Sequence, residues 1–204
     1  MKEKIKELTT NILGELPQIP FVIDQVSEAI NWCVEAHDSG IVIRLLETAL
    51  NVAKYTREIS DPNFYRTYLV VAALIADIPN VKEDEKFAQF KSASGAIEKA
   101  VDNIIVDTSR GCFKSLCIHL AQLSKKDENC LVIMLYGILQ DLRDITVGLK
   151  DSGTKAPITP QDYITVLGYS YVMANLRMAR LPLADKTKVI INDIEILLNS
   201  EVDY

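Results

Sequence analysis

Apolar residues recur along this 204-residue chain with the spacing of helices. In residues 23–37 the apolar positions fall at i, i+4, i+7 and i+8, on one face of a helix: Val26, Ile30, Cys33 and Val34. Residues 41–59 carry a second face of the same kind. No segment alternates apolar and polar residues with the period of two that a half-buried strand shows. The pattern therefore predicts an all-α protein.

Prolines and polar residues mark the ends of these helices. A helix within residues 60–80 is expected to begin at Ser60 or Asp61 as its cap, with Pro62 in its first turn. Pro79 should end it, because proline cannot continue a helix.

The rest of the chain divides in the same way. Its expected features are two short helices around Ser94-Gly95, two longer helices within 111–150 separated by 124–129, a loop over 150–162, a helix beginning at Thr159-Pro160 and a last helix after Pro182. We predict about nine or ten helices in a single domain over residues 1–204, with a C-terminal helix and tail over 183–204.

Charge and composition exclude several classes of function. The formal net charge of -6 argues against nucleic acid as the main partner, because no general basic field is present. The longest apolar run is broken by Asp77 and Pro79, so no membrane span is expected. The charged N-terminus is not typical of a signal peptide. Four cysteines without CxxC spacing and two histidines make a zinc site improbable. We expect reduced thiols in a cytoplasmic protein, with no metal and no other cofactor.

Three segments, in order, carry a more specific signal. They read GIVIRLLETALNVA (40–53), YRTYLVVAALIADIPN (65–80) and LVIMLYGILQDLRDI (131–145). They resemble signature helices of the HD superfamily, in particular the alarmone hydrolase domain of RelA/SpoT-type stringent-response proteins. The resemblance covers roughly residues 25–180 and implies an HD-like helical bundle.

In that family two histidines and two aspartates hold a divalent metal, which activates water against a phosphate ester. The resemblance places these four ligands on Arg44, Ala76, Asp77 and Gly137. Ala76 and Gly137 offer no ligand atom, and a guanidinium cannot coordinate a cation. Asp77 alone cannot hold a metal in a defined geometry. The resemblance therefore implies a relative that has lost its metal site.

Arg44 suggests two uses for the altered site. It can form a salt bridge with Asp77 that fills the pocket and only holds the helices together. It can instead help to bind an anion such as a nucleotide phosphate, because guanidinium binds phosphate oxygens in a bidentate manner without a metal.

Other side chains could complete such an anion site. Lys114 and Arg143 would add positive charge, and Tyr136 or Phe113 would offer a face for stacking. Each also has an ordinary structural interpretation: Lys114 as an exposed lysine, and Arg143 as an ion-pair partner of its neighbours Asp141 and Asp144.

These patterns support three hypotheses. The first is a catalytically inactive HD-like protein that sequesters or senses a nucleotide or another phosphorylated ligand. The second is a structural protein-interaction module or homo-oligomer with a filled pocket and a large apolar patch elsewhere, for which the aromatic and methionine-rich residues 168–181 are one candidate. The third is a metal-dependent nucleotide phosphohydrolase at a non-standard site that uses Asp77, Asp141 and Asp144. The candidate ligand-binding residues are Arg44, Asp77, Lys114, Tyr136, Asp141 and Arg143.

Overall fold

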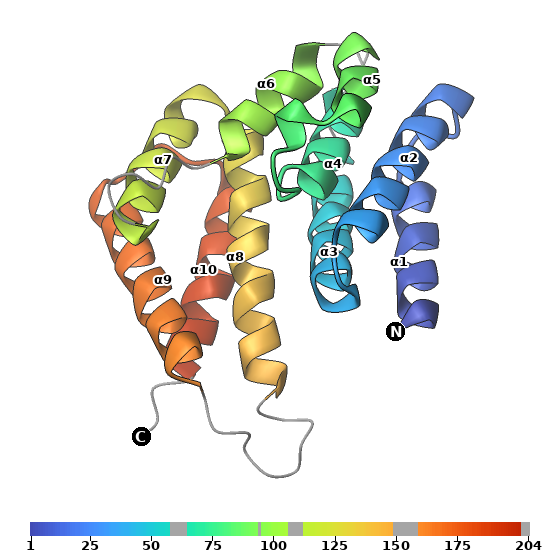
Figure 1. Ribbon diagram of the computed structural model, residues 1–204. Helices are drawn as coiled ribbons and strands as arrows, with labels where there is room; N and C mark the ends of the chain where they lie inside the picture. The colour runs from blue at the N-terminus through green and yellow to red at the C-terminus, as the bar shows by residue number, and fades with distance from the viewer. Residues whose placement is uncertain (58–64, 94, 106–111, 149–158, 201–204) are drawn as a thin grey trace. The chain divides into compact units, whose positions relative to one another are not determined.

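The described part of the chain is helical throughout its regular structure. The computed structural model describes residues 1–57, 65–93, 95–105, 112–148 and 159–200. Ten α-helices and one short 3-10 turn lie within these ranges (Figure 1), which confirms the all-α prediction and the expected number of helices. Contacts between helices gather in two compact units, residues 1–105 and residues 106–204. That both belong to one domain stays a prediction.

The first unit contains the helices that carry the first two resembling segments. Its elements are α1 (Lys2–Glu15), α2 (Pro20–Ala36), α3 (Ser39–Tyr55), α4 (Tyr65–Ile75), the 3-10 turn η1 (Val81–Glu83), α5 (Glu85–Ala93) and α6 (Gly95–Ile104). Helices α5 and α6 are the two short helices predicted around Ser94-Gly95, and Ser94 itself lies outside the described residues. The predicted cap of α4 at Ser60 or Asp61 lies outside the described residues.

Helix α4 is the centre of this unit. It packs against α2, α3 and α6, and every residue from Arg66 to Ile75 is buried. A helix can be enclosed in this way only if it is apolar around its circumference, because an unpaired polar side chain would lose its hydration. The stretch from Leu69 to Ile75 has no polar side chain and satisfies that condition.

Arg66 is the one charged side chain on α4, and it holds the ends of two neighbouring helices. Its Nη2 donates to the carbonyl oxygen of Glu15 at the end of α1 (2.5 Å) and to that of Ala53 in the last turn of α3 (3.0 Å). The last carbonyls of a helix lack partners within the helix and carry the negative end of its dipole, so a buried cation stabilises them. Arg57 adds an ion pair to the carboxylate of Glu15.

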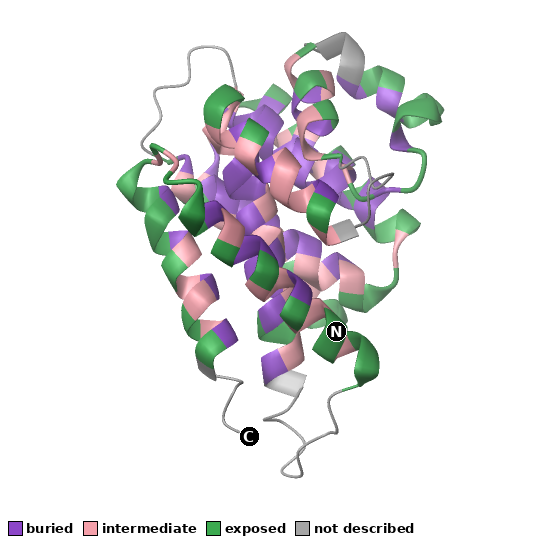
Figure 2. Ribbon diagram, turned by 90° about the vertical axis from the view of Figure 1, so that its left-hand side faces the viewer, coloured by how far each residue is buried: buried purple, intermediate pink, exposed green. Residues whose placement is uncertain are grey.

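The second unit contains four helices in its described part: α7 (Cys112–Lys126), α8 (Glu128–Gly148), α9 (Pro160–Met178) and α10 (Asp185–Ser200). Helices α8 and α9 each pack against α7 and α10. Figure 2 shows the resulting pattern of buried and exposed positions along the helices. The predicted loop over 150–162 lies mostly outside the described residues.

Polar side chains fix where two of these helices begin, α9 and α10. Thr159 and Asp162 form a reciprocal capping box at the start of α9, which confirms the predicted start at Thr159-Pro160. The Glu128 carboxylate accepts hydrogen bonds from the Ala184 backbone N–H (2.8 Å) and from the Thr187 hydroxyl (2.6 Å). The first turn of α8 is thereby tied to the first turn of α10.

Helices α7 and α9 meet at a glycine. The Phe113 ring lies over Gly168, and a Cβ atom at that position would be 2.1 Å from Phe113 Cζ. The same ring makes an edge-to-face contact with Tyr169, with ring centroids 6.0 Å apart. The Phe113 ring is therefore used in helix packing, and the proposed role as a stacking face for a ligand does not fit this position.

We expect Gly168→Ala to lower the free energy of unfolding by about 1–3 kcal/mol, because the methyl group displaces the Phe113 ring from its contact. Gly137→Ala on α8 is the matched control, since a Cβ there meets nothing within 4 Å. It should raise the free energy of unfolding by roughly 0.5–1 kcal/mol by reducing the freedom of the unfolded chain. Urea unfolding followed by circular dichroism measures both. Equal effects of the two variants would contradict this account of the α7–α9 contact.

Candidate functional site

Arg44 and Asp77 form the expected pair in the first unit. Arg44 lies in the middle of α3, and Asp77 follows the last residue of α4 by two positions. The Arg44 Nη2 atom is 3.5 Å from Asp77 Oδ2. A carboxylate just beyond a helix C-terminus faces the negative end of the helix dipole, and the guanidinium offsets that repulsion. The predicted salt bridge is confirmed.

This pair is open to solvent. The exposed fraction of the side chain is 30% for Arg44 and 58% for Asp77. Water screens charges at such positions, so an ion pair of this kind contributes only about 0–1 kcal/mol to stability. The buried apolar surface of α4, by contrast, contributes on the order of 1.5–3 kcal/mol for each large side chain. The pair therefore sits on the α3–α4 contact and adds little to its strength.

The carboxylate of Asp77 also acts on a buried thiol. Burial, and secondarily the negative charge of Asp77, raise the pKa of Cys33 on α2 to about 12. The reactive form of cysteine is the thiolate, which is therefore suppressed at neutral pH. Cys33, Cys117 and Cys130 are all free thiols in the structure. Cys33 acts as a small core residue beside the pair. Its environment raises the pKa of the thiol, whereas that of an activated nucleophile lowers it.

The other predicted site residues belong to the second unit. Tyr136, Asp141 and Arg143 share α8, and Lys114 lies on α7. Tyr136 is half-buried, whereas Lys114 and Arg143 are exposed. The structure thus divides the six candidate residues into one pair in the first unit and one group of four in the second.

Both carboxylates on this part of α8 have hydrogen-bond donors. The hydroxyl of Tyr169 on α9 donates to Asp141 Oδ2 at 2.6 Å, and the side-chain amide of Gln140 donates to Asp144 Oδ1 at 3.3 Å. The Tyr169 contact links α9 to α8, and no pattern in the sequence indicates it. It gives Asp141 a role in packing the unit.

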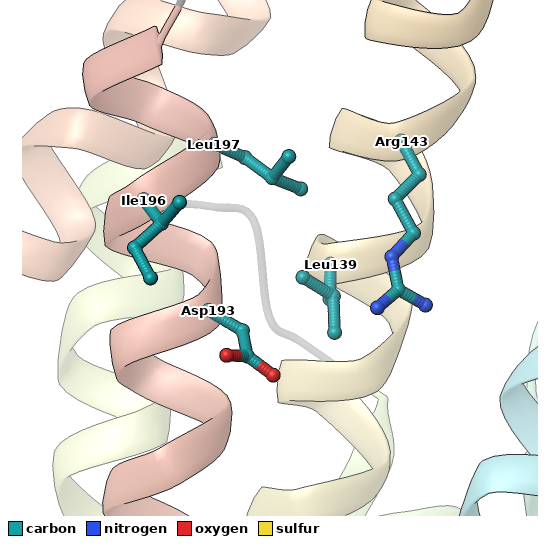
Figure 3. Close-up of a pocket in the computed structure, with 5 residues that line it drawn as sticks. All are labelled: Leu139, Arg143, Asp193, Ile196 and Leu197. Carbon is teal, nitrogen blue, oxygen red and sulfur yellow. The ribbon is translucent and has the colours of Figure 1, made fainter.

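Arg143 borders a pocket between α8 and α10. The pocket has a volume of about 250 Å³ and is lined by Leu139, Arg143, Asp193, Ile196 and Leu197. Figure 3 shows Leu139 and Leu197 pointing into the space between the two helices, with the Asp193 carboxylate also directed toward α8. Among the residues that the structure describes, the Arg143 guanidinium makes no ion pair, so the predicted pairing with Asp141 or Asp144 is not found.

The charges around this pocket are balanced. One guanidinium, from Arg143, and one carboxylate, from Asp193, border a lining that is otherwise apolar. A polyphosphate would be attracted by the first group and repelled by the second. Sequence reasoning missed Asp193; its helical spacing with Ile196 and Leu197 is the only signal that could have placed the three on one face of α10.

The residues to which the resemblance assigns the metal ligands do not fit a metal. In the first unit Ala76 has no ligand atom, and the Arg44 guanidinium, itself a cation, lies 3.5 Å from Asp77 Oδ2. In the second unit Gly137 likewise offers no side-chain ligand. Within the described ranges, no group of three or more His, Cys, Asp or Glu side chains is arranged to hold a metal ion.

Comparison with protein-family models, with curated protein sequences and with solved structures gave no match. The resemblance to the alarmone hydrolases therefore stays a prediction. Among the described helices, none is both long enough and apolar enough to cross a membrane.

A double-mutant cycle of Arg44→Ala and Asp77→Ala should give a coupling energy of about 0.2–1 kcal/mol, as for other exposed ion pairs. The Lys82–Asp102 pair is a suitable comparison, because both of its side chains are about half exposed. Urea unfolding of the four proteins of each cycle provides the energies. A coupling above roughly 2 kcal/mol for Arg44 and Asp77 alone would show that the pair is much stronger than its exposure implies.

The raised pKa of Cys33 predicts a loss of stability in alkali. Above pH 9.0, the ordinary value, the thiol ionises in the unfolded chain but stays protonated in the folded one until about pH 12. The free energy of unfolding should therefore fall with rising pH across this window, by up to about 1.4 kcal/mol per pH unit from this group. Denaturant titrations at several pH values test this. In Cys33→Ala the decline should be shallower by that amount, and identical slopes would contradict the assignment.

Proposed function

We propose that this protein is a non-catalytic helical module that acts by binding another protein chain. The observation that carries the proposal is the outward side of α9, where Ile164, Leu167, Tyr171 and Met178 are all at least half exposed. Exposed apolar side chains are ordinary when they are scattered, but a contiguous row on one helix is typical of an interaction surface.

The Arg44–Asp77 pair supports the same proposal. It occupies the place that the resemblance assigns to metal chemistry, and it supplies a cation of the protein's own in contact with the remaining acidic residue. An HD-like scaffold of this kind keeps its helices without an activated water. The protein would then act by binding through its surface and not by catalysing a reaction.

Binding through α9 would follow the physics of a helix packing on another protein. Side chains at i, i+3, i+4 and i+7 form a continuous ridge that enters a groove of the partner. Transfer of these side chains out of water supplies the affinity.

A second candidate function is metal-free binding of a nucleotide or another phosphorylated ligand. Its support is the exposed Arg143 guanidinium at the α8–α10 pocket, which has no ion-pair partner in the described part of the chain. The Asp193 carboxylate at the same pocket opposes a highly charged ligand, which is why this function takes second place.

Capture experiments with the tagged protein, in extract of the cells that encode it, test the first proposal. The Leu167→Glu variant should lose the proteins that the unaltered chain retains, because a buried unpaired carboxylate costs several kcal/mol. Val189→Glu on α10 is the matched control, because Val189 is 59% exposed but lies on another helix. Equal capture by both variants would contradict the proposal, as would stoichiometric bound metal together with Mn²⁺-dependent phosphate release by the purified protein.

Calorimetry with guanosine tetraphosphate and a panel of nucleotides tests the second candidate. Saturable heat that is lost in Arg143→Ala but kept in Lys114→Ala would assign the ligand to the α8–α10 pocket. No binding at millimolar concentration would rule out the second candidate and leave the first unaffected.

A further inference from the structure

Helix α9 is apolar on two opposite sides. Its inward side is buried against its own unit through Gly168, Val172, Met173 and Leu176. The outer face of α9 consists of Ile164, Leu167, Tyr171, Ala174 and Met178, and all five residues are exposed. Because a helix turns by about 100° per residue, these two groups lie on nearly opposite sides of the cylinder. The helices of the second unit therefore cover only one of the two apolar sides of α9.

The spacing of the outer face is that of a helix–helix seam. Its members follow one another at intervals of three, four, three and four residues, which is the a/d pattern of a coiled coil. This regularity extends from Ile164 to Met178, over most of α9, and distinguishes the outer face from a chance group of exposed apolar residues.

The exposed area is large enough for a specific interface. The exposed fractions are 52% for Ile164, 52% for Leu167, 50% for Tyr171 and 72% for Met178. About half of a large apolar or aromatic side chain amounts to roughly 100 Å², so these residues expose on the order of 400–500 Å². Two such faces packed together, with their flanking residues, would bury on the order of 1,000 Å² in total. This area is at the lower limit for specific protein interfaces.

We propose that the partner on this face is a second copy of the chain, packed antiparallel so that α9 lies against α9. The inference rests on the proposed function and specifies its partner. The helix dipoles favour this arrangement, because two antiparallel helices place the positive end of one beside the negative end of the other. The charged side chains of α9 have partners within the chain: Asp162 is in the capping box with Thr159, and Arg177 forms an ion pair with Glu195.

A parallel pair is disfavoured by the same dipoles. It would place the like ends of the two helices side by side. In the antiparallel pair Tyr171 and Leu167 lie near the middle of the contact, and Ile164 of one copy lies toward Met178 of the other. The outer face is thus complementary to itself, as a two-fold symmetric interface requires.

Sedimentation equilibrium of the full chain across the micromolar range tests whether the partner is a second copy. The expected molar mass is twice the 22.8 kDa of one chain. Leu167→Glu and Tyr171→Glu should weaken dimerisation by at least roughly 100-fold, because each buries an unpaired charge at the centre of the contact. Val189→Glu should remain dimeric. Helical content by circular dichroism should be unchanged in all three variants, since the altered side chains are exposed within the unit.

Two results would overturn this inference. One is a monomer at all concentrations, and the other is a dimer that persists unchanged in both Leu167→Glu and Tyr171→Glu. A monomer leaves the proposed function standing if the capture of other proteins still depends on Leu167. Loss of both the dimer and any Leu167-dependent capture removes the proposed function as well.

The orientation is tested by the double variant Ile164→Cys, Met178→Cys. These positions are about 21 Å apart along one helix, so they cannot form a disulfide within a chain. Under mild oxidation, peptide mapping should find a bond from position 164 of one copy to position 178 of the other. Bonds between identical positions, 164 to 164 and 178 to 178, would show a parallel pair and contradict the proposed arrangement.

Discussion

The enclosure of α4 is the constraint from which the first unit is built. Its residues are apolar on every side, so three helices, α2, α3 and α6, pack around it. The single charge, on Arg66, is accommodated because its guanidinium reaches the free carbonyls at the ends of α1 and α3. Asp77 stands where α4 leaves the core, and it is this exit that brings the carboxylate beside Arg44. The pair is a consequence of the packing and not its cause.

The same physical rule gives α9 its significance. An apolar helix surface is stable in water only when something covers it, and α4 shows how completely one chain can do so. The helices of the second unit cover one side of α9 and leave the outer face exposed. A second copy would supply the missing cover with the same residues, and the dipoles of the two α9 helices would favour an antiparallel direction. The function of the protein would then depend on an apolar helix surface that its own chain leaves uncovered.

Sequence patterns predicted the helices well and the polar contacts unevenly. Pro160 and Gly95 marked helix boundaries because their backbone effects are local. The Arg44–Asp77 pair was foreseen only through the resemblance, since the two residues are 33 positions apart. The Tyr169–Asp141 hydrogen bond and the Arg66 contacts depend on which helices become neighbours, and periodicity carries no such information. Periodicity also could not tell which side of α9 faces its own unit, because both sides are apolar.

Hydroxyl-radical footprinting of Tyr171 over a dilution series tests the central claim most directly. Oxidation of this residue, read by mass spectrometry, reports whether water reaches the outer face of α9. The account predicts that Tyr171 is protected in concentrated protein and becomes reactive on dilution, while Phe21 on α2, which is 41% exposed, stays equally reactive throughout. High reactivity of Tyr171 at every concentration would contradict the claim that a second copy covers this face.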